Sequence, residues 1–359
     1  MFRSLNVSDM LAACLACTLA GSAASAAPAA EKPASSEQSV EDATLLSPFG
    51  GRSAFSPDGK KIAFVGKTYD DAYEIDIETR KVRNLTRGMP HQGIMRIQYL
   101  PTGDFLVTAP RRHIGPNTRA HLEMWVLDKK LERGLQPLGE QVFEGIAVSR
   151  KKNLIAWTVV EPELKSGESW QLAFVRTTKR YIADVTYENG VARLTGKREI
   201  MPALPQECGF IEPQDFREND TELVYSCMGP VSSGSFTISV MGYKLDSGDN
   251  ITYYRRPGEY NEVEGIAPNG RWTTVECGKQ DKPGMPPLDI CRLELKQNGS
   301  MTRLVRGTTP GSTSDISNPI VSPDGKWLVF QRSDGAAGEI GEGYGVYLLR
   351  LSDETGSSQ

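Results

Sequence analysis

The chain has 359 residues and a formal net charge of −4. This mild acidity argues against nucleic acid or an anionic membrane surface as a partner, because both attract basic proteins. Hydrophobic residues make up 39% and charged residues 24% of the chain, which is typical of a globular protein and excludes a largely disordered one.

The first 26 residues predict a secretory signal peptide. Arg3 precedes the apolar run Met10–Gly21, and the small residues Ala24–Ala26 suit a cleavage site. The apolar run is too short to span a bilayer. Residues 27–40 consist mainly of Ala, Pro, Ser and Glu, a composition that predicts a disordered tether. We therefore expect a periplasmic protein that does not span the membrane.

A nine-residue phrase occurs twice. Ser56–Phe64 reads Ser-Pro-Asp-Gly-Lys-Lys-Ile-Ala-Phe, and Ser322–Phe330 reads Ser-Pro-Asp-Gly-Lys-Trp-Leu-Val-Phe. Each copy places a Pro-Asp-Gly turn directly before a short apolar strand. The carboxylates of Asp58 and Asp324 are expected to serve the turn rather than chemistry. Self-similarity of this kind indicates a repeat architecture.

The turn recurs through the chain and counts the repeats. Two further strong copies and two degraded ones lie between the two phrases, at Pro101–Gly103, Pro268–Gly270, Arg150–Lys152 and Glu218–Asp220. In each unit one strand enters the turn, a second leaves it, and two more follow. Six units of four antiparallel strands predict an all-β fold, a six-bladed β-propeller over residues 41–352, followed by a disordered tail at 353–359.

The sixth unit lacks a fourth strand of its own. The segment Asp42–Ser47 precedes the first unit and belongs to no other. We expect it to supply the outer strand of the last blade, because an unpaired edge there would be prone to aggregation.

Four cysteines remain after the signal peptide. Their even number in an exported chain suggests disulfides, and the repeats favour Cys208 with Cys227 and Cys277 with Cys291, each pair within one unit. Buried free thiols are the alternative.

The repeated phrase resembles the repeat of the TolB-type propeller family. The resemblance is good in the first and last units, fair at Pro268–Trp272 and faint elsewhere. It implies a six-bladed propeller, often exported to the bacterial periplasm. In TolB an N-terminal α/β domain precedes the propeller, and that domain has no counterpart here, because only about a dozen residues separate the tether from the first blade.

Propellers usually bind at a mouth of the central channel, where the first strands of the blades converge. Polar residues near the starts of those strands are the candidate ligand-binding residues: Arg52, His91, Arg96, Glu144, Glu212, Gln214, Glu264, Asp315 and Asn318. The four carboxylates among them would suit a calcium ion or a cationic peptide. A water-filled polar channel is the alternative.

A basic loop, Arg111–Arg119, lies between the second and third strands of the second unit. We expect it to be a solvated cationic patch. Its His113 lies near His121, but the pair is not expected to hold a metal.

These features favour a non-catalytic scaffold that binds an envelope protein or a small ligand, with no catalytic residues and no resident cofactor assigned. Neither a Gly-x-Ser-x-Gly elbow nor room for a hydrolase domain is present. The alternative is a propeller enzyme, a lyase, glycoside hydrolase or cyclotransferase, that uses Glu and His residues at the channel mouth.

Overall fold

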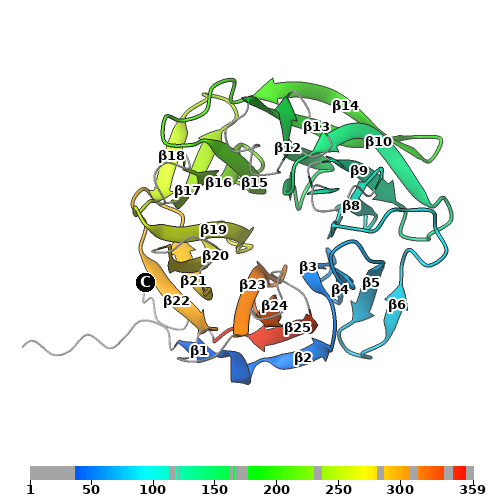
Figure 1. Ribbon diagram of the computed structural model, residues 1–359, viewed down its shortest axis with the longest axis horizontal. Coiled ribbons are helices and arrows are strands. Elements are labelled where there is room, and N and C mark those ends of the chain that lie inside the picture. The colour runs from blue at the N-terminus through cyan, green and yellow to red at the C-terminus, as the bar shows by residue number, and fades with distance from the viewer. Residues whose placement is uncertain are drawn as a thin grey trace, which may run out of the picture. The chain divides into compact units, whose positions relative to one another are not determined.

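The computed structural model describes residues 37–112, 118–119, 121–161, 165, 168, 177–229, 237–280, 287–307, 314–334 and 343–352. They form six antiparallel sheets around a central axis, a six-bladed β-propeller (Figure 1). Val40–Asp42 forms a short 3-10 helix, and Thr118, Arg119 and His121 also have 3-10 geometry. None of the described segments is a helix long and apolar enough to cross a membrane. The predicted fold class is confirmed.

Each blade runs outward in chain order from its innermost strand, except that the sixth takes its outermost strand from the N-terminal region. From the innermost to the outermost strand, the first blade contains β3 (Gly51–Phe55), β4 (Lys61–Val65), β5 (Ala72–Asp76) and β6 (Val82–Asn84), and the second contains β7 (Arg96–Tyr99), β8 (Phe105–Pro110), β9 (Leu122–Leu127) and β10 (Leu135–Val142). The third blade contains β11 (Ile146–Val148), β12 (Leu154–Glu161), β13 (Thr177–Glu188) and β14 (Val191–Ile200), and the fourth contains β15 (Phe210–Arg217), β16 (Glu222–Met228), β17 (Ile238–Lys244) and β18 (Asn250–Tyr254). The fifth blade contains β19 (Glu259–Ile266), β20 (Trp272–Lys279), β21 (Asp289–Glu294) and β22 (Met301–Arg306), and the sixth contains β23 (Ser314–Val321), β24 (Trp327–Asp334), β25 (Gly343–Arg350) and β2 (Thr44–Ser47).

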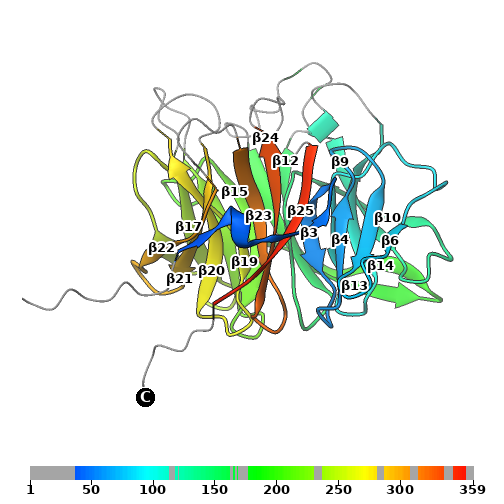
Figure 2. The ribbon, with the colours of Figure 1, turned by 90° about the horizontal axis from the view of Figure 1, so that it is seen from below.

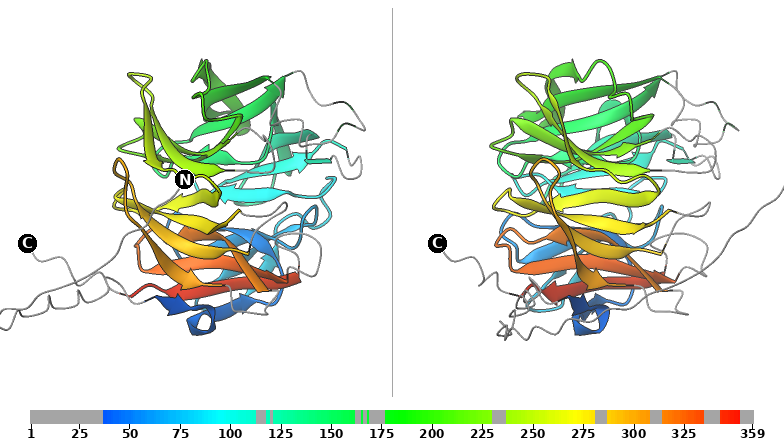
Figure 3. Two further views of the ribbon diagram at one scale, coloured as in Figure 1. Left: turned by 60° about the vertical axis from the view of Figure 1, so that its left-hand side comes forward. Right: turned by 90° about the vertical axis from the view of Figure 1, so that its left-hand side faces the viewer.

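The N-terminal segment closes the ring as predicted. Strand β2 pairs antiparallel with β25, and the two strands, blue and red, lie side by side in Figure 3. Strand β1 (Gln38–Ser39) adds a parallel fifth strand to the fifth blade through β22. Glu37 forms ion pairs with Arg303 and Arg306 beside it. Residues 37–40, which were assigned to the tether, are thus held against the propeller.

The repeated turns owe their shape to the same hydrogen bonds in both copies. Ser56 Oγ donates to Asp58 Oδ1 at 2.6 Å, and the Lys60 N–H donates to the same oxygen at 3.1 Å. Ser322 and Asp324 repeat this arrangement at 2.5 Å. Hydrogen bonding from Ser56 lowers the pKa of Asp58, so this carboxylate stays ionised within its turn. The Asp residues serve the turns, as the sequence indicates.

The hydrophobic core is divided among the interfaces between neighbouring blades. Phe64 and Ile75 of the first blade, for example, pack with Val329 and Val346 of the sixth, and Leu46 of β2 joins them. The faces of the blades thus bury apolar residues. Figure 2 shows the innermost strands running along the axis of the ring.

The cysteines form two disulfides, Cys208–Cys227 and Cys277–Cys291. These are the two pairings that the repeat pattern favours. The first lies in the fourth blade and its entry segment, and the second joins the neighbouring strands β20 and β21. The alternative of free buried thiols is not observed.

Candidate functional site in the central channel

Bulges in the innermost strands place polar residues on the channel wall. The pairing register shifts in β3, β15, β19 and β23, and a predicted site residue lies in each shifted segment: Arg52, Gln214, Glu264 and Asn318. Arg52 and Asn318 adopt positive φ angles of 53° and 49°. A bulge changes the direction of a side chain, and strained backbone is frequent at functional sites. The channel wall is therefore the region where the repeat departs from regular strand geometry.

The channel contains a cavity of about 370 Å³ that extends to the repeated turns, each with Pro first and Gly third, at one mouth. Pro57, Pro101, Pro268 and Pro323 lie at this end. Every blade contributes to the lining of this cavity. In blade order, examples of the lining residues are Arg52, Arg96, Arg150, Gln214, Glu264 and Ile320. A cavity lined by all six blades is the natural binding site of this fold.

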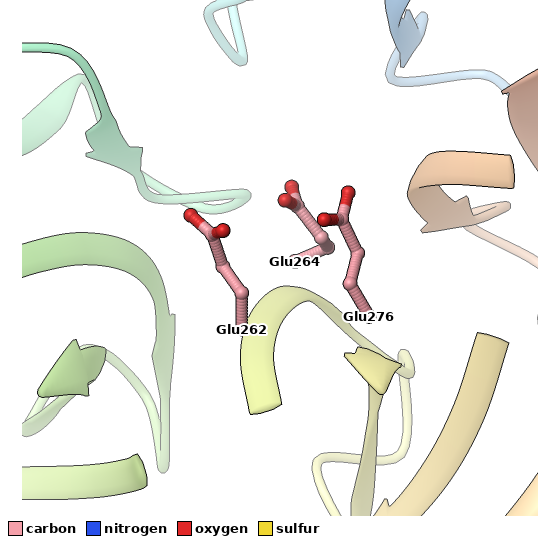
Figure 4. Close-up of side chains that lie close together, drawn as sticks. All are labelled: Glu262, Glu264 and Glu276. Atoms are coloured by element: carbon pink, nitrogen blue, oxygen red, sulfur yellow. The ribbon is translucent and has the colours of Figure 1, made fainter. Parts of the chain in front are cut away.

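Three carboxylates gather on one side of the channel. Glu262 and Glu264 come from β19 and Glu276 from β20, and one oxygen of each lies within 4.8 Å of the others. Figure 4 shows the three carboxylates side by side, pointing into the channel, with Glu264 and Glu276 nearest to each other. Burial and the neighbouring carboxylates raise the pKa of Glu264 to about 8 and also raise that of Glu276.

Glu212 of β15 is a fourth buried carboxylate, with an exposed fraction of 1%. Neither of its side-chain oxygens has a hydrogen-bond partner among the described residues. Burial raises the pKa of Glu212 to about 7, and the charge of Glu262 adds to this rise, while Arg96 and Arg119 oppose it. A buried polar group without a partner is costly and calls for an explanation, such as a ligand that satisfies it.

Three arginines balance part of this negative charge. Arg52, Arg96 and Arg119 interact electrostatically with Glu212. Burial, together with the charges of Arg96 and Arg119, lowers the pKa of Arg52 to about 9. The channel therefore offers cationic and anionic groups side by side.

Three predicted residues make other contacts. His91 Nε2 lies 2.9 Å from Asp71 Oδ1, and its Nδ1 accepts the Gly93 N–H at 3.0 Å, so both ring nitrogens are occupied. Glu144 forms an ion pair with Arg119. Asp315 Oδ1 accepts the Leu288 N–H at 3.0 Å. None of the three belongs to the cluster of three carboxylates.

Sequence reasoning missed Glu262, Glu276 and Arg119 as channel residues. Glu262 precedes Glu264 by two positions on an expected strand, and the period of two could have placed both on one face. Arg119 belongs to the basic loop, yet its guanidinium lies among the channel charges rather than in an exposed patch. His113 of that loop lies outside the described residues.

No family model and no curated protein matches the sequence. Among solved structures, a gluconolactonase from Xanthomonas campestris is similar with a TM-score of 0.54 and 12% identity, over 87% of this chain and 90% of that one. An oligogalacturonate lyase from Vibrio parahaemolyticus follows with a TM-score of 0.53 and 14% identity, over 87% and 94%.

TolB from Acinetobacter baumannii is 20% identical, with a TM-score of 0.36, over 58% of this chain and 44% of that one. The present chain thus spans less than half of that TolB. At these identities the comparisons establish the architecture and no activity. The protein is a six-bladed β-propeller, and TolB proteins are among the solved structures that it resembles.

Proposed function

We propose that this protein is a non-catalytic, ligand-binding scaffold of the cell envelope and that it holds its ligand in the central channel. The observation that carries the proposal is the cavity lined by all six blades. Glu212, two residues before the lining residue Gln214 on β15, is buried without a hydrogen-bond partner among the described residues. Buried polar groups are normally satisfied, so a bound polar molecule would complete this site.

The mixed charge of the wall defines the ligand class. Arg52 and Arg96 can bind a carboxylate, while Glu212 and Glu264 can bind an ammonium group or a cation. A small polar molecule, or an extended segment of an envelope protein, can meet both requirements. Nucleic acid is disfavoured by the net charge of −4.

Action in the periplasm follows from two features. The expected signal peptide directs export, and the two disulfides suit an oxidising compartment.

Enzymatic activity is the second candidate function, and a specific observation favours it. Glu212 has a pKa of about 7, which suits a general acid or base, and it lies among arginines that can stabilise developing negative charge. Two similar folds carry the names of a lyase and a gluconolactonase. A lyase, glycoside hydrolase or cyclotransferase would use this carboxylate.

Native mass spectrometry of the protein purified from periplasm tests the scaffold proposal. We expect an additional mass on the wild-type protein that is lost in Arg96→Gln. Arg193→Gln is the matched control, because Arg193 lies on the outer strand β14 and its exposed side chain pairs with Glu188. Equal binding by both variants would contradict a site in the channel, and turnover that Glu212→Gln abolishes would establish the enzymatic alternative.

A further inference from the structure

The geometry points to a divalent-cation site in the channel, formed by Glu262, Glu264 and Glu276, and we propose that it binds Ca²⁺. The inference deepens the proposed ligand-binding function and rests on it for the use of the channel.

Each of the three carboxylates has one oxygen held by a protein donor. Glu276 Oε1 accepts the backbone N–H of Asn318 at 2.6 Å, and Glu264 Oε1 accepts the Asn318 side-chain amide at 3.2 Å. Glu262 Oε2 accepts the hydroxyl of Tyr260. Such donors fix the orientation of metal ligands in known sites.

Two buried carboxylates in this region have oxygens without a hydrogen-bond partner among the described residues. Glu264 has an exposed fraction of only 4%, and its buried Oε2 has no hydrogen-bond partner among the described residues. Glu212, coupled to Glu262 by charge, is buried with both oxygens unpartnered within the same described part of the chain. These unsatisfied oxygens are a reason, independent of the clustering itself, to expect a bound group.

The spacing suits calcium. Two oxygens on opposite sides of Ca²⁺ lie about 5 Å apart, because each bond measures about 2.3–2.6 Å. The three oxygens all lie within 4.8 Å of one another, so one Ca²⁺ can contact all three. The donor set contains only oxygen, which favours a hard cation over zinc.

The local charge also favours a cation. Glu144 pairs with Arg119, which leaves Arg52 and Arg96 opposite the carboxylates of Glu212, Glu262, Glu264 and Glu276. When all four carboxylates are ionised, two negative charges are in excess, and one divalent ion balances them. An organic ammonium group would balance only one.

Calorimetric titration of the metal-free, full-length protein with CaCl₂ tests the site. We expect one Ca²⁺ per chain and a rise in Tm, with affinity reduced at least about tenfold in Glu264→Gln and Glu276→Gln. Both substitutions keep an amide oxygen that can accept from Asn318, so the fold should survive.

Asp315→Asn is the matched control, since Asp315 is a buried channel-end carboxylate outside the cluster. It should bind Ca²⁺ as the wild type does. The inference is overturned if millimolar Ca²⁺ gives neither heat nor a Tm shift, or if the Glu264 and Glu276 variants bind as tightly as Asp315→Asn. An organic ligand that still depends on Arg96 would then leave the scaffold proposal intact.

Discussion

The backbone N–H of Asn318 donates a 2.6 Å hydrogen bond to Glu276 Oε1, which joins the bulge of the sixth blade to the second strand of the fifth. The side-chain amide of Asn318 reaches Glu264 of the same neighbouring blade. One residue at positive φ thus connects two blades at the channel wall. Asn tolerates this left-handed conformation better than most other non-glycine residues. The residue at position 318 therefore matters both for its side-chain hydrogen bond and for its backbone conformation.

Two replacements of Asn318 separate its side-chain hydrogen bond from its backbone conformation. Asn318→Ala loses the side-chain bond and places a Cβ-bearing residue without local hydrogen bonding at a φ of 49°. We expect it to lower the free energy of unfolding by about 2 kcal/mol, whereas Asn318→Gly should cost about 1 kcal/mol less, because glycine adopts this φ freely. Urea denaturation of the two variants measures the difference. An Ala variant as stable as the Gly variant would show that backbone conformation does not matter there.

The second disulfide closes a short loop between β20 and β21, with a sequence separation of 14. Replacing both Cys277 and Cys291 by Ala should lower the free energy of unfolding by about 3 kcal/mol, since the unfolded chain regains the entropy of the open loop. Denaturant unfolding of the variant under oxidising conditions measures the loss.

Reducing agent provides the control for this pair. It should lower the stability of the wild type and lower that of the Cys277/Cys291 variant less, because only Cys208–Cys227 remains to be reduced. Equal sensitivity of the two proteins would mean that the second disulfide contributes nothing.

The sequence predicted the ring because its determinants are local. The hydrogen bonds of the Ser56–Asp58 turn involve residues within a few positions of each other, and alternation in the following strands sets their faces. The closing strand was predictable for another reason. The sixth blade lacked a fourth strand and the segment Asp42–Ser47 belonged to no blade, so pairing the two was the simplest way to cover the open edge.

The channel wall could be predicted only in part because it depends on bulges and on contacts between blades. A one-residue shift in register turns side chains to the other face. Pro319, directly after Asn318, is a local sign of the bulge in β23, but it does not specify which contacts Asn318 then makes. Glu276 lies on a second strand, whose residues are expected to pack between blades. Only the meeting of two blades reveals that it accepts from Asn318.

The closing strand offers a test of ring closure within two adjacent residues. Leu46 is buried between the sixth and first blades with Val346 and Leu348, whereas Leu45 has an exposed fraction of 46%. Leu46→Ala should lower the free energy of unfolding by about 2–4 kcal/mol through lost apolar burial and a cavity. Leu45→Ala on the same strand should change it by less than about 0.5 kcal/mol.

Chemical denaturation of both Leu variants distinguishes the contribution of the buried Leu46 side chain from that of the backbone pairing of β2. Similar losses at the two positions would show that β2 is held by backbone pairing alone. A large loss confined to Leu46 would show that its side chain secures the junction.

Asp315 should make stability depend on pH in a defined window. Burial raises its pKa from 3.8 to about 6 in the folded protein. A raised carboxyl pKa means that the folded state holds the proton more tightly, so the associated stability is complete below about pH 4 and is lost as pH rises to about 6.

Asp315→Asn cannot titrate and still accepts from Leu288, which makes it the matched reference. The stability of the wild type relative to Asp315→Asn should therefore fall by at most about 3 kcal/mol between pH 4 and 6 and stay constant above. Urea unfolding at several pH values measures this difference, and a difference that does not change across the window would mean that Asp315 ionises in the folded protein as it does in the unfolded chain.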